Sequence, residues 1–123
     1  MGRVGDLPEE TSVCAFAERI KDCLGSPSIT VLDSGNTIRR VAVLGGAGKD
    51  HVSAAAESGA DAFVTGEAGY NALLDAEGGE MSIFCAGHYH TEQPVCKRLA
   101  AWVSEAVPGS EVEVYAGCEL KVL

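Results

Sequence analysis

The chain has 123 residues, 46% hydrophobic and 22% charged, which is the composition of one globular domain. Eighteen acidic residues against nine basic ones give a formal net charge of -9, which disfavours binding to nucleic acid or anionic lipid. No apolar run approaches the roughly 20 residues of a spanning helix, and the N-terminus lacks the basic start of a leader peptide. We therefore expect a single domain over residues 1–123, with neither nucleic acid nor a membrane as partner.

The cysteine pattern favours reduced thiols. The five cysteines are an odd number, and no two of them form a C-x-x-C pair that would indicate a zinc knuckle or a redox dithiol. They stand at positions 14, 23, 85, 96 and 118. A cytoplasmic location follows as the expectation.

The hydrophobic pattern predicts alternating strands and helices after a lead-in over residues 1–8 that shows no period. The predicted helices are 12–24, 49–58, 68–77 and 92–106, and the predicted strands are 28–32, 40–44, 62–65, 81–86 and 111–115. Thr11 or Ser12 can cap the first helix, and Gly25 can end it. Because strand and helix alternate strictly from residue 40, we predict an α/β fold, three-layer α/β/α, with a mostly parallel sheet.

Glycine follows three of the predicted strands, at Gly45, Gly66 and Gly87. Glycine lets the backbone turn sharply or approach a ligand, although it also commonly just ends a strand. The residues that follow include Glu67 and the run 88–92, His-Tyr-His-Thr-Glu. Since ligands bind at the carboxyl ends of the strands in such sheets, we expect a site at this edge.

The loop after the second strand is a candidate anion site through the backbone of Gly45, Gly46 and Gly48. It is not a Walker A loop, because Val43 and Asp50 stand where glycine and Ser or Thr are required. The alternative is a tight turn without a ligand.

The densest group of metal-capable side chains is His88, His90 and Glu92. With Thr91 as the cap of a helix that begins at Glu92, His88 would lie in the preceding loop and Pro94 in the first turn. Imidazole and carboxylate together are half of a common hydrolytic metal site, while a solvated loop is the alternative.

Other residues have structural interpretations. Cys85 fits a small core residue at a strand end better than a nucleophile. An apolar stripe on the last helix is expected to be core, with Trp102 anchoring that packing or a subunit contact. The stripe comprises Val95, Leu99, Trp102, Val103 and Ala106.

Four sequence blocks together resemble one family, the NGG-one-interacting-factor-three-like proteins, also called GTP cyclohydrolase 1 type 2 homologs. The blocks are GRVGDLP at 2–8, RVAVLGGAG at 40–48, GADAFVTGE at 59–67 and AGHYHTE at 86–92. The resemblance implies an α/β/α fold, a dinuclear metal centre, toroidal hexamers and a metal-dependent hydrolase activity on a substrate that it does not name.

By the same resemblance, His88 and Glu92 match two metal ligands of the family, for zinc, iron or manganese. Glu67 matches an acidic position near the centre, where it would orient water or a ligand. Two features depart from the family pattern: Asn71 replaces a frequent histidine, and the adjacent histidine pair of the family's N-terminal half is absent from this sequence.

The missing ligands change the functional prediction. With His88 and Glu92 alone, each ion would have one or two protein ligands, so binding would be weak. We therefore predict the C-terminal lobe of a two-lobe metal protein, inactive alone, partnered by a complementary N-terminal lobe or by further copies in a homo-oligomer. The alternative is a non-catalytic binding or regulatory module of the same fold.

Overall fold

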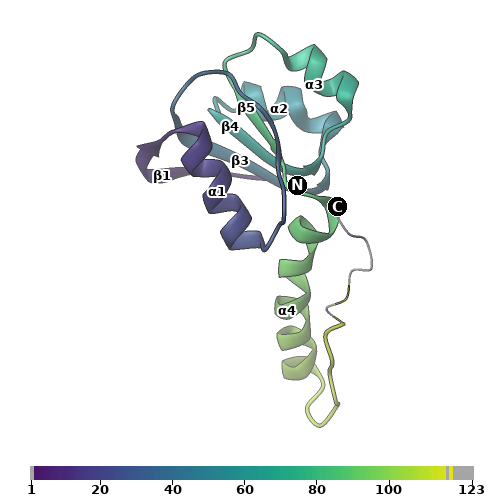
Figure 1. Cartoon of the computed structure of the whole chain (residues 1–123). Helices are drawn as coiled ribbons and strands as arrows, with labels where there is room; N and C mark the ends of the chain where they lie inside the picture. Colours follow the sequence, from purple (N-terminus) through teal and green to yellow (C-terminus); the bar gives the residue numbers. More distant parts are fainter. Residues whose placement is uncertain (1, 116, 118–123) are drawn as a thin grey trace.

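The computed structural model describes residues 2–115 and 117 and contains one five-stranded sheet with helices on both faces (Figure 1). The strands are β1 (Arg3–Thr11), β2 (Thr30–Leu32), β3 (Ile38–Ala47), β4 (Ala62–Glu67) and β5 (Ser82–Cys85). The helices are α1 (Val13–Leu24), the 3₁₀ turn η1 (Lys49–His51), α2 (Val52–Glu57), α3 (Tyr70–Ala76) and α4 (His88–Ala106). The predicted α/β class is confirmed.

The strand order is β1-β3-β4-β5-β2. The three central strands β3, β4 and β5 run parallel, and the edge strands β1 and β2 run antiparallel to their neighbours. The expectation of a lead-in over residues 1–8 was wrong, because its residues 3–8 form the first part of β1. Most side chains of β1 are exposed, so main-chain pairing with β3 holds the strand and leaves no hydrophobic period in the sequence.

Helix α1 matches its prediction closely. The Ser12 side chain accepts a hydrogen bond from the Ala15 amide at 3.3 Å, and Gly25 ends the helix in the left-handed conformation at φ 64°. The helix buries Phe16 and Ile20 against one face of the sheet, where the Phe16 ring meets Phe84 edge-on at 5.2 Å.

A second apolar cluster forms on the opposite face, which α2 and α3 cover (Figure 1). Phe63 and Ile83 project from β4 and β5 and pack with Ala55 of α2 and with Met81. The three-layer arrangement therefore rests on two separate apolar cores.

Helix α4 differs from its prediction in three ways. It begins at His88 rather than Glu92, so Thr91 does not cap it and Pro94 lies inside it rather than in its first turn. Gly87, at φ 89°, precedes the first helical residue and makes the sharp turn out of β5. The helix therefore gains a full turn, which places His88 on the same helix as Glu92.

The apolar stripe of α4 is exposed, so the expectation of core was wrong. Figure 1 shows α4 extending away from the sheet, with no other helix or strand packed along its outer part. Val95, Leu99, Trp102 and Val103 are all exposed, and the Arg98 guanidinium lies over the Trp102 ring at 5.2 Å. Helical spacing indicates that the stripe exists, but it does not show whether the stripe is buried; among the described residues it stays exposed.

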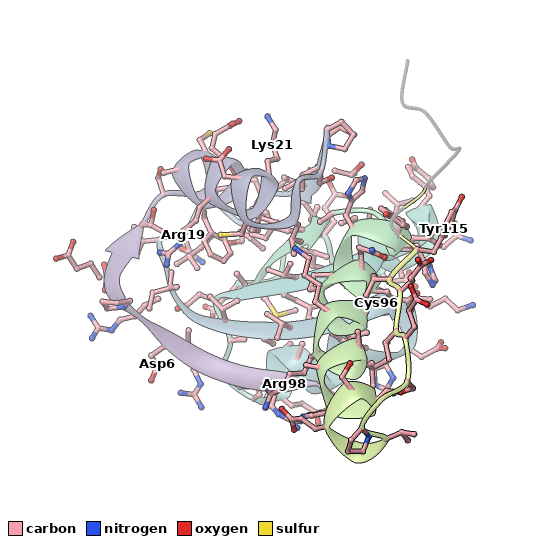
Figure 2. The ribbon with its side chains drawn as sticks, turned by 90° about the horizontal axis from the view of Figure 1, so that it is seen from below. Asp6, Arg19, Lys21, Cys96, Arg98 and Tyr115 are labelled. Carbon is pink, nitrogen blue, oxygen red and sulfur yellow. The ribbon has the colours of Figure 1, made fainter. Side chains whose placement is uncertain are left out.

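The strand predicted over 111–115 is also wrong. Residues 111–115 have no regular secondary structure and run back beside α4 (Figures 1 and 2). The sheet position next to β5 is taken by β2, so a further strand cannot pair there.

Within residues 2–115 and 117, no helix is long and apolar enough to cross a membrane.

Candidate metal centre

The candidate site lies where the carboxyl ends of β3 and β4 meet the first turns of α4. Strand β3 reaches Ala47, so Gly45 and Gly46 lie within the strand end and not in a following loop. The register from Leu44 opposite Thr65 to Ala47 opposite Glu67 contains one extra residue in β3, which is a β-bulge. Gly46 adopts φ 73° at this bulge.

Glycines let α4 approach the strand ends closely. A Cβ on Gly45 would lie 3.0 Å from the Thr91 carbonyl oxygen, and one on Gly66 would lie 2.7 Å from Thr91 Oγ1. A Cβ on Gly46 would lie 2.5 Å from Glu92 Oε1 and 3.3 Å from His88 Nε2. Side chains at these positions would therefore displace the helix turn or the candidate ligands.

Thr91 attaches this helix turn to the bulge. Its Oγ1 accepts a hydrogen bond from the Gly46 amide at 3.1 Å, and the hydroxyl donates toward the His88 carbonyl at 3.0 Å. The buried Thr65 hydroxyl donates to the Gly46 carbonyl at 3.0 Å. Sequence reasoning missed the roles of both threonines, because neither belongs to a pattern of metal-capable residues.

The structure brings His88, Glu92 and Glu67 together. As residues i and i+4 of α4, His88 and Glu92 share one helix face, and His88 Nε2 lies 3.4 Å from Glu92 Oε1. The other ring nitrogen, Nδ1, lies 3.3 Å from Glu67 Oε1 at the end of β4. All three side chains are partly exposed, so the group is open to solvent.

The imidazole between two carboxylates has a specific chemical consequence. A neutral imidazole carries one N–H, so it can donate to only one of the two carboxylates. The second nitrogen then faces a carboxylate oxygen with a lone pair, and a proton or a cation between them resolves that repulsion.

The donor set suits a divalent ion, since imidazole and carboxylate bind zinc, iron and manganese. A carboxylate on the second imidazole nitrogen is the usual outer partner of a ligating histidine. Gly46 lies on the Nε2 side of the ring, where a Cβ would come within 3.3 Å of Nε2. Among the described residues, however, no group of three or more His, Cys, Asp or Glu is arranged to hold a metal ion.

The backbone amides of Gly46 and Gly48, which were predicted to bind an anion, are hydrogen-bonded within the chain. The Gly46 amide donates to Thr91 Oγ1 and the Gly48 amide donates to the Glu67 carbonyl at 2.8 Å, so both are already used within the chain. The anion-binding role of Gly45, Gly46 and Gly48 stays a prediction. His90 lies on the first turn of α4, where its ring meets Tyr89 edge-on at 5.3 Å.

Cys85 lies beside this centre at the end of β5. Burial raises the pKa of its thiol, the nearby Glu67 carboxylate raises it further, and a backbone hydrogen bond from Ala68 opposes these effects. A half-buried thiol whose pKa is raised lacks the thiolate character of a nucleophile.

A profile of the Duf34/NIF3 family, described as NGG1p interacting factor 3, matches residues 1–119. The chain belongs to the Duf34/NIF3 family. The GTP cyclohydrolase 1 type 2 homolog of Haemophilus influenzae is 33% identical over 110 residues, covering 89% of this chain and 43% of that protein. The protein of the same name in Nostoc is 36% identical over 101 residues, covering 80% and 38%. The family predicted from the four sequence blocks is confirmed.

Solved structures of the family share this fold. The Bacillus cereus protein related to NIF3 has a TM-score of 0.84 at 29% identity, covering all of this chain and 35% of that one. Reduced HcgD from Methanocaldococcus jannaschii has a TM-score of 0.70 at 26% identity, covering 87% of this chain and 43% of that one. The chain thus spans less than half the length of these relatives.

Proposed function

We propose that this chain is the metal-binding lobe of a dinuclear-metal-dependent hydrolase of the GTP cyclohydrolase 1 type 2 homolog type, incomplete and inactive alone. The observation that carries the proposal is His88 held between Glu67 and Glu92, at 3.3 Å and 3.4 Å. The free thiols of Cys14, Cys23, Cys85 and Cys96 agree with a cytoplasmic location.

Each of the three side chains has a distinct role. Glu67 Oε1 lies 3.3 Å from His88 Nδ1, where it would favour the tautomer protonated at Nδ1 and leave the Nε2 lone pair for the ion. His88 Nε2 and the Glu92 carboxylate are then the ligands for a zinc, iron or manganese ion. A divalent ion there would supply Lewis-acid activation of water or of a carbonyl group.

We further propose that a complementary lobe supplies the remaining ligands and covers the exposed face of α4. Two observations support a complementary lobe on this face of α4. The chain spans 43% of the Haemophilus influenzae relative, which leaves more than half of that protein to form another lobe. The exposed apolar stripe of α4 begins at Val95, one turn beyond Glu92, so a lobe seated on it would also reach the centre.

Metal binding by a chimera tests the proposal. In the chimera this chain replaces the matching segment of the Haemophilus influenzae relative, and zinc and manganese affinities are measured by calorimetry for the chimera and for the 123-residue chain. We expect tight binding by the chimera and weak binding by the chain. In the chimera, His88→Ala should abolish tight binding at one ion, and Glu67→Gln should weaken it about 10- to 100-fold.

Glu80→Gln is the matched control, because it removes the same charge at an exposed position away from the centre. Tight stoichiometric metal on the 123-residue chain would contradict the half-site. Equal affinities for the chimera with Glu67→Gln and with Glu80→Gln would contradict the role of Glu67.

A further inference from the structure

We propose that a cavity beside Glu67 binds the uncharged, hydrogen-bond-donating part of the substrate; this inference rests on the proposed function. The cavity has a volume of about 300 Å³. Its walls include Ser26, Ser28, Thr30, Glu67, Cys85 and His90. The Ser26 hydroxyl already bonds to the carbonyls of Ser28 and Ala86, whereas the proposed ligand set does not use the hydroxyls of Ser28 and Thr30 or the Cys85 thiol.

The cavity adjoins the candidate centre directly. Glu67 forms part of its wall while its Oε1 faces His88 Nδ1 at 3.3 Å. Gly66 and Gly87, which flank the centre at the ends of β4 and β5, also line it. A molecule in the cavity would therefore lie on the Nδ1 side of His88, while the proposed ion lies on the Nε2 side.

The sheet explains why polar side chains converge there. Thr30 of β2 and Cys85 of β5 are directly paired in the antiparallel register, so their side chains project from the same face. His90 reaches the cavity from the first turn of α4. Strands β2, β4 and β5 and helix α4 therefore all contribute to the walls of this cavity.

Charge determines the kind of ligand. Lysine and arginine are absent from the residues that line the cavity in the described part of the chain, and the charged group there is the Glu67 carboxylate. A carboxylate only accepts hydrogen bonds, so it selects N–H or O–H donors and disfavours an anion. The volume is at the small end of ligand sites, which fits a nitrogen heterocycle or amide of modest size.

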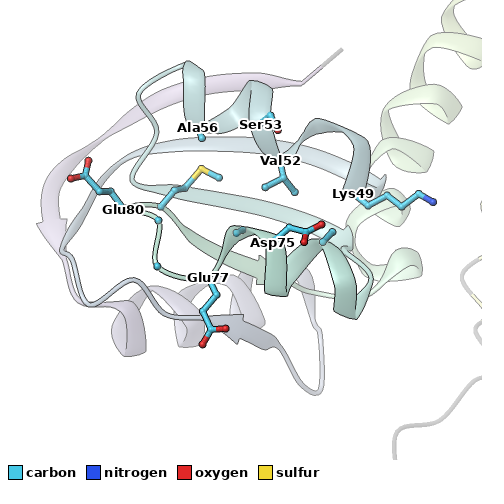
Figure 3. A pocket seen from close by; sticks show the side chains of 12 residues that line it. Lys49, Val52, Ser53, Ala56, Asp75, Glu77 and Glu80 are labelled. Atoms are coloured by element: carbon cyan, nitrogen blue, oxygen red, sulfur yellow. The ribbon is translucent and has the colours of Figure 1, made fainter.

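A second cavity, about 450 Å³ between α2 and α3, is a poorer candidate (Figure 3). It shares no lining residue with the cavity beside Glu67 or with the candidate centre. In Figure 3 the side chains of Glu77 and Glu80 point away from one another.

Thiol footprinting of the metal-free chain tests the inference. Alkylation of each cysteine by N-ethylmaleimide is followed by mass spectrometry at one fixed pH, with adenine, cytosine or inorganic phosphate added. Cys14 and Cys23 are exposed and free, so they serve as internal references. We expect adenine or cytosine to slow alkylation of Cys85 several-fold and saturably, with no effect of phosphate and no change at the references.

Variants connect the protection to the cavity wall. Thr30→Val removes one wall hydroxyl at nearly constant volume and should weaken the protection, whereas Thr37→Val, outside this cavity, should not. Absence of protection by both heterocycles, or equal protection by phosphate, overturns the inference. Because no metal is present, these results are independent of whether the chimera binds metal.

Discussion

Gly46 is the residue whose lack of a side chain matters most to the candidate centre. It combines φ 73° with a Cβ position only 2.5 Å from Glu92 Oε1. Gly46→Ala should destabilise the chain by at least about 1–2 kcal/mol from the left-handed backbone alone. It should also push the Glu92 carboxylate aside and weaken metal binding by the chimera. Urea unfolding and metal titration measure the two effects separately.

Gly25→Ala is the matched control for this change. Gly25 has a similar φ of 64°, but an added Cβ would meet nothing within 4 Å. Both variants should therefore lose stability through backbone strain, and only Gly46→Ala should alter metal affinity. If the two variants bind metal equally well, the close approach of Gly46 to the ligands has no functional importance.

Thr91 offers a second test at the scale of one side chain. Thr91→Val keeps the shape but leaves the Gly46 amide without the acceptor that lies 3.1 Å away. An unsatisfied, partly buried donor should cost about 1–2 kcal/mol of unfolding free energy. Thr37→Val removes an exposed hydroxyl bonded to Glu10 and should cost much less. Equal costs in urea unfolding would show that the bond from Gly46 to Thr91 does not stabilise the turn.

Among the secondary-structure elements, sequence reasoning succeeded where local signals were complete. Helix α1 has its cap at Ser12, its apolar face and its stop at Gly25, and all three were predicted. It failed for β1, where pairing with β3 leaves no hydrophobic period. It also placed the start of α4 four residues late, because Thr91 resembles a cap when the Gly87 turn is not known.

The start of α4 decides whether His88 and Glu92 lie on one helix face. A histidine in a loop and a glutamate at a helix terminus need not meet, whereas positions 88 and 92 of one helix must share a face. His88 and Glu92 could be named as candidate ligands from sequence, and their binding of metal stays a prediction. Their approach to Glu67 depended on the bulge at Gly46 and on the threonine bonds, which depend on tertiary structure.

Helix α4 carries an internal proline, which makes its own prediction. Pro94 cannot donate to the His90 carbonyl, and its ring crowds that turn. Pro94→Ala should restore this hydrogen bond and raise the unfolding free energy by about 1–3 kcal/mol. Denaturant unfolding followed by circular dichroism measures the gain, with Pro108→Ala, beyond the helix end, as a control. No gain would mean that the helix accommodates Pro94 without loss.

At the scale of the whole molecule, the main feature left to explain is the exposed apolar stripe of α4. Two apolar clusters on the sheet account for α1, α2 and α3, but the α4 stripe joins neither. Sequence periodicity assigned the stripe to a core, since an amphipathic helix ordinarily packs within its own domain. More than half of the length of these relatives lies outside the match, and the proposed complementary lobe would supply that packing.

Burial of the α4 stripe by a second lobe can be tested by comparing how much one substitution lowers the unfolding free energy in the 123-residue chain and in the chimera. Leu99 of α4 is 47% exposed, so Leu99→Ala should cost less than about 1 kcal/mol in the 123-residue chain. In the chimera, where we expect the second lobe to bury Leu99, the same change should cost about 2–5 kcal/mol. Leu74 of α3 is the matched control, because it is 46% exposed and lies outside the α4 stripe. Leu74→Ala should cost the same small amount in both proteins, measured by urea unfolding. If Leu99→Ala is equally mild in the chimera, the complementary lobe does not cover α4.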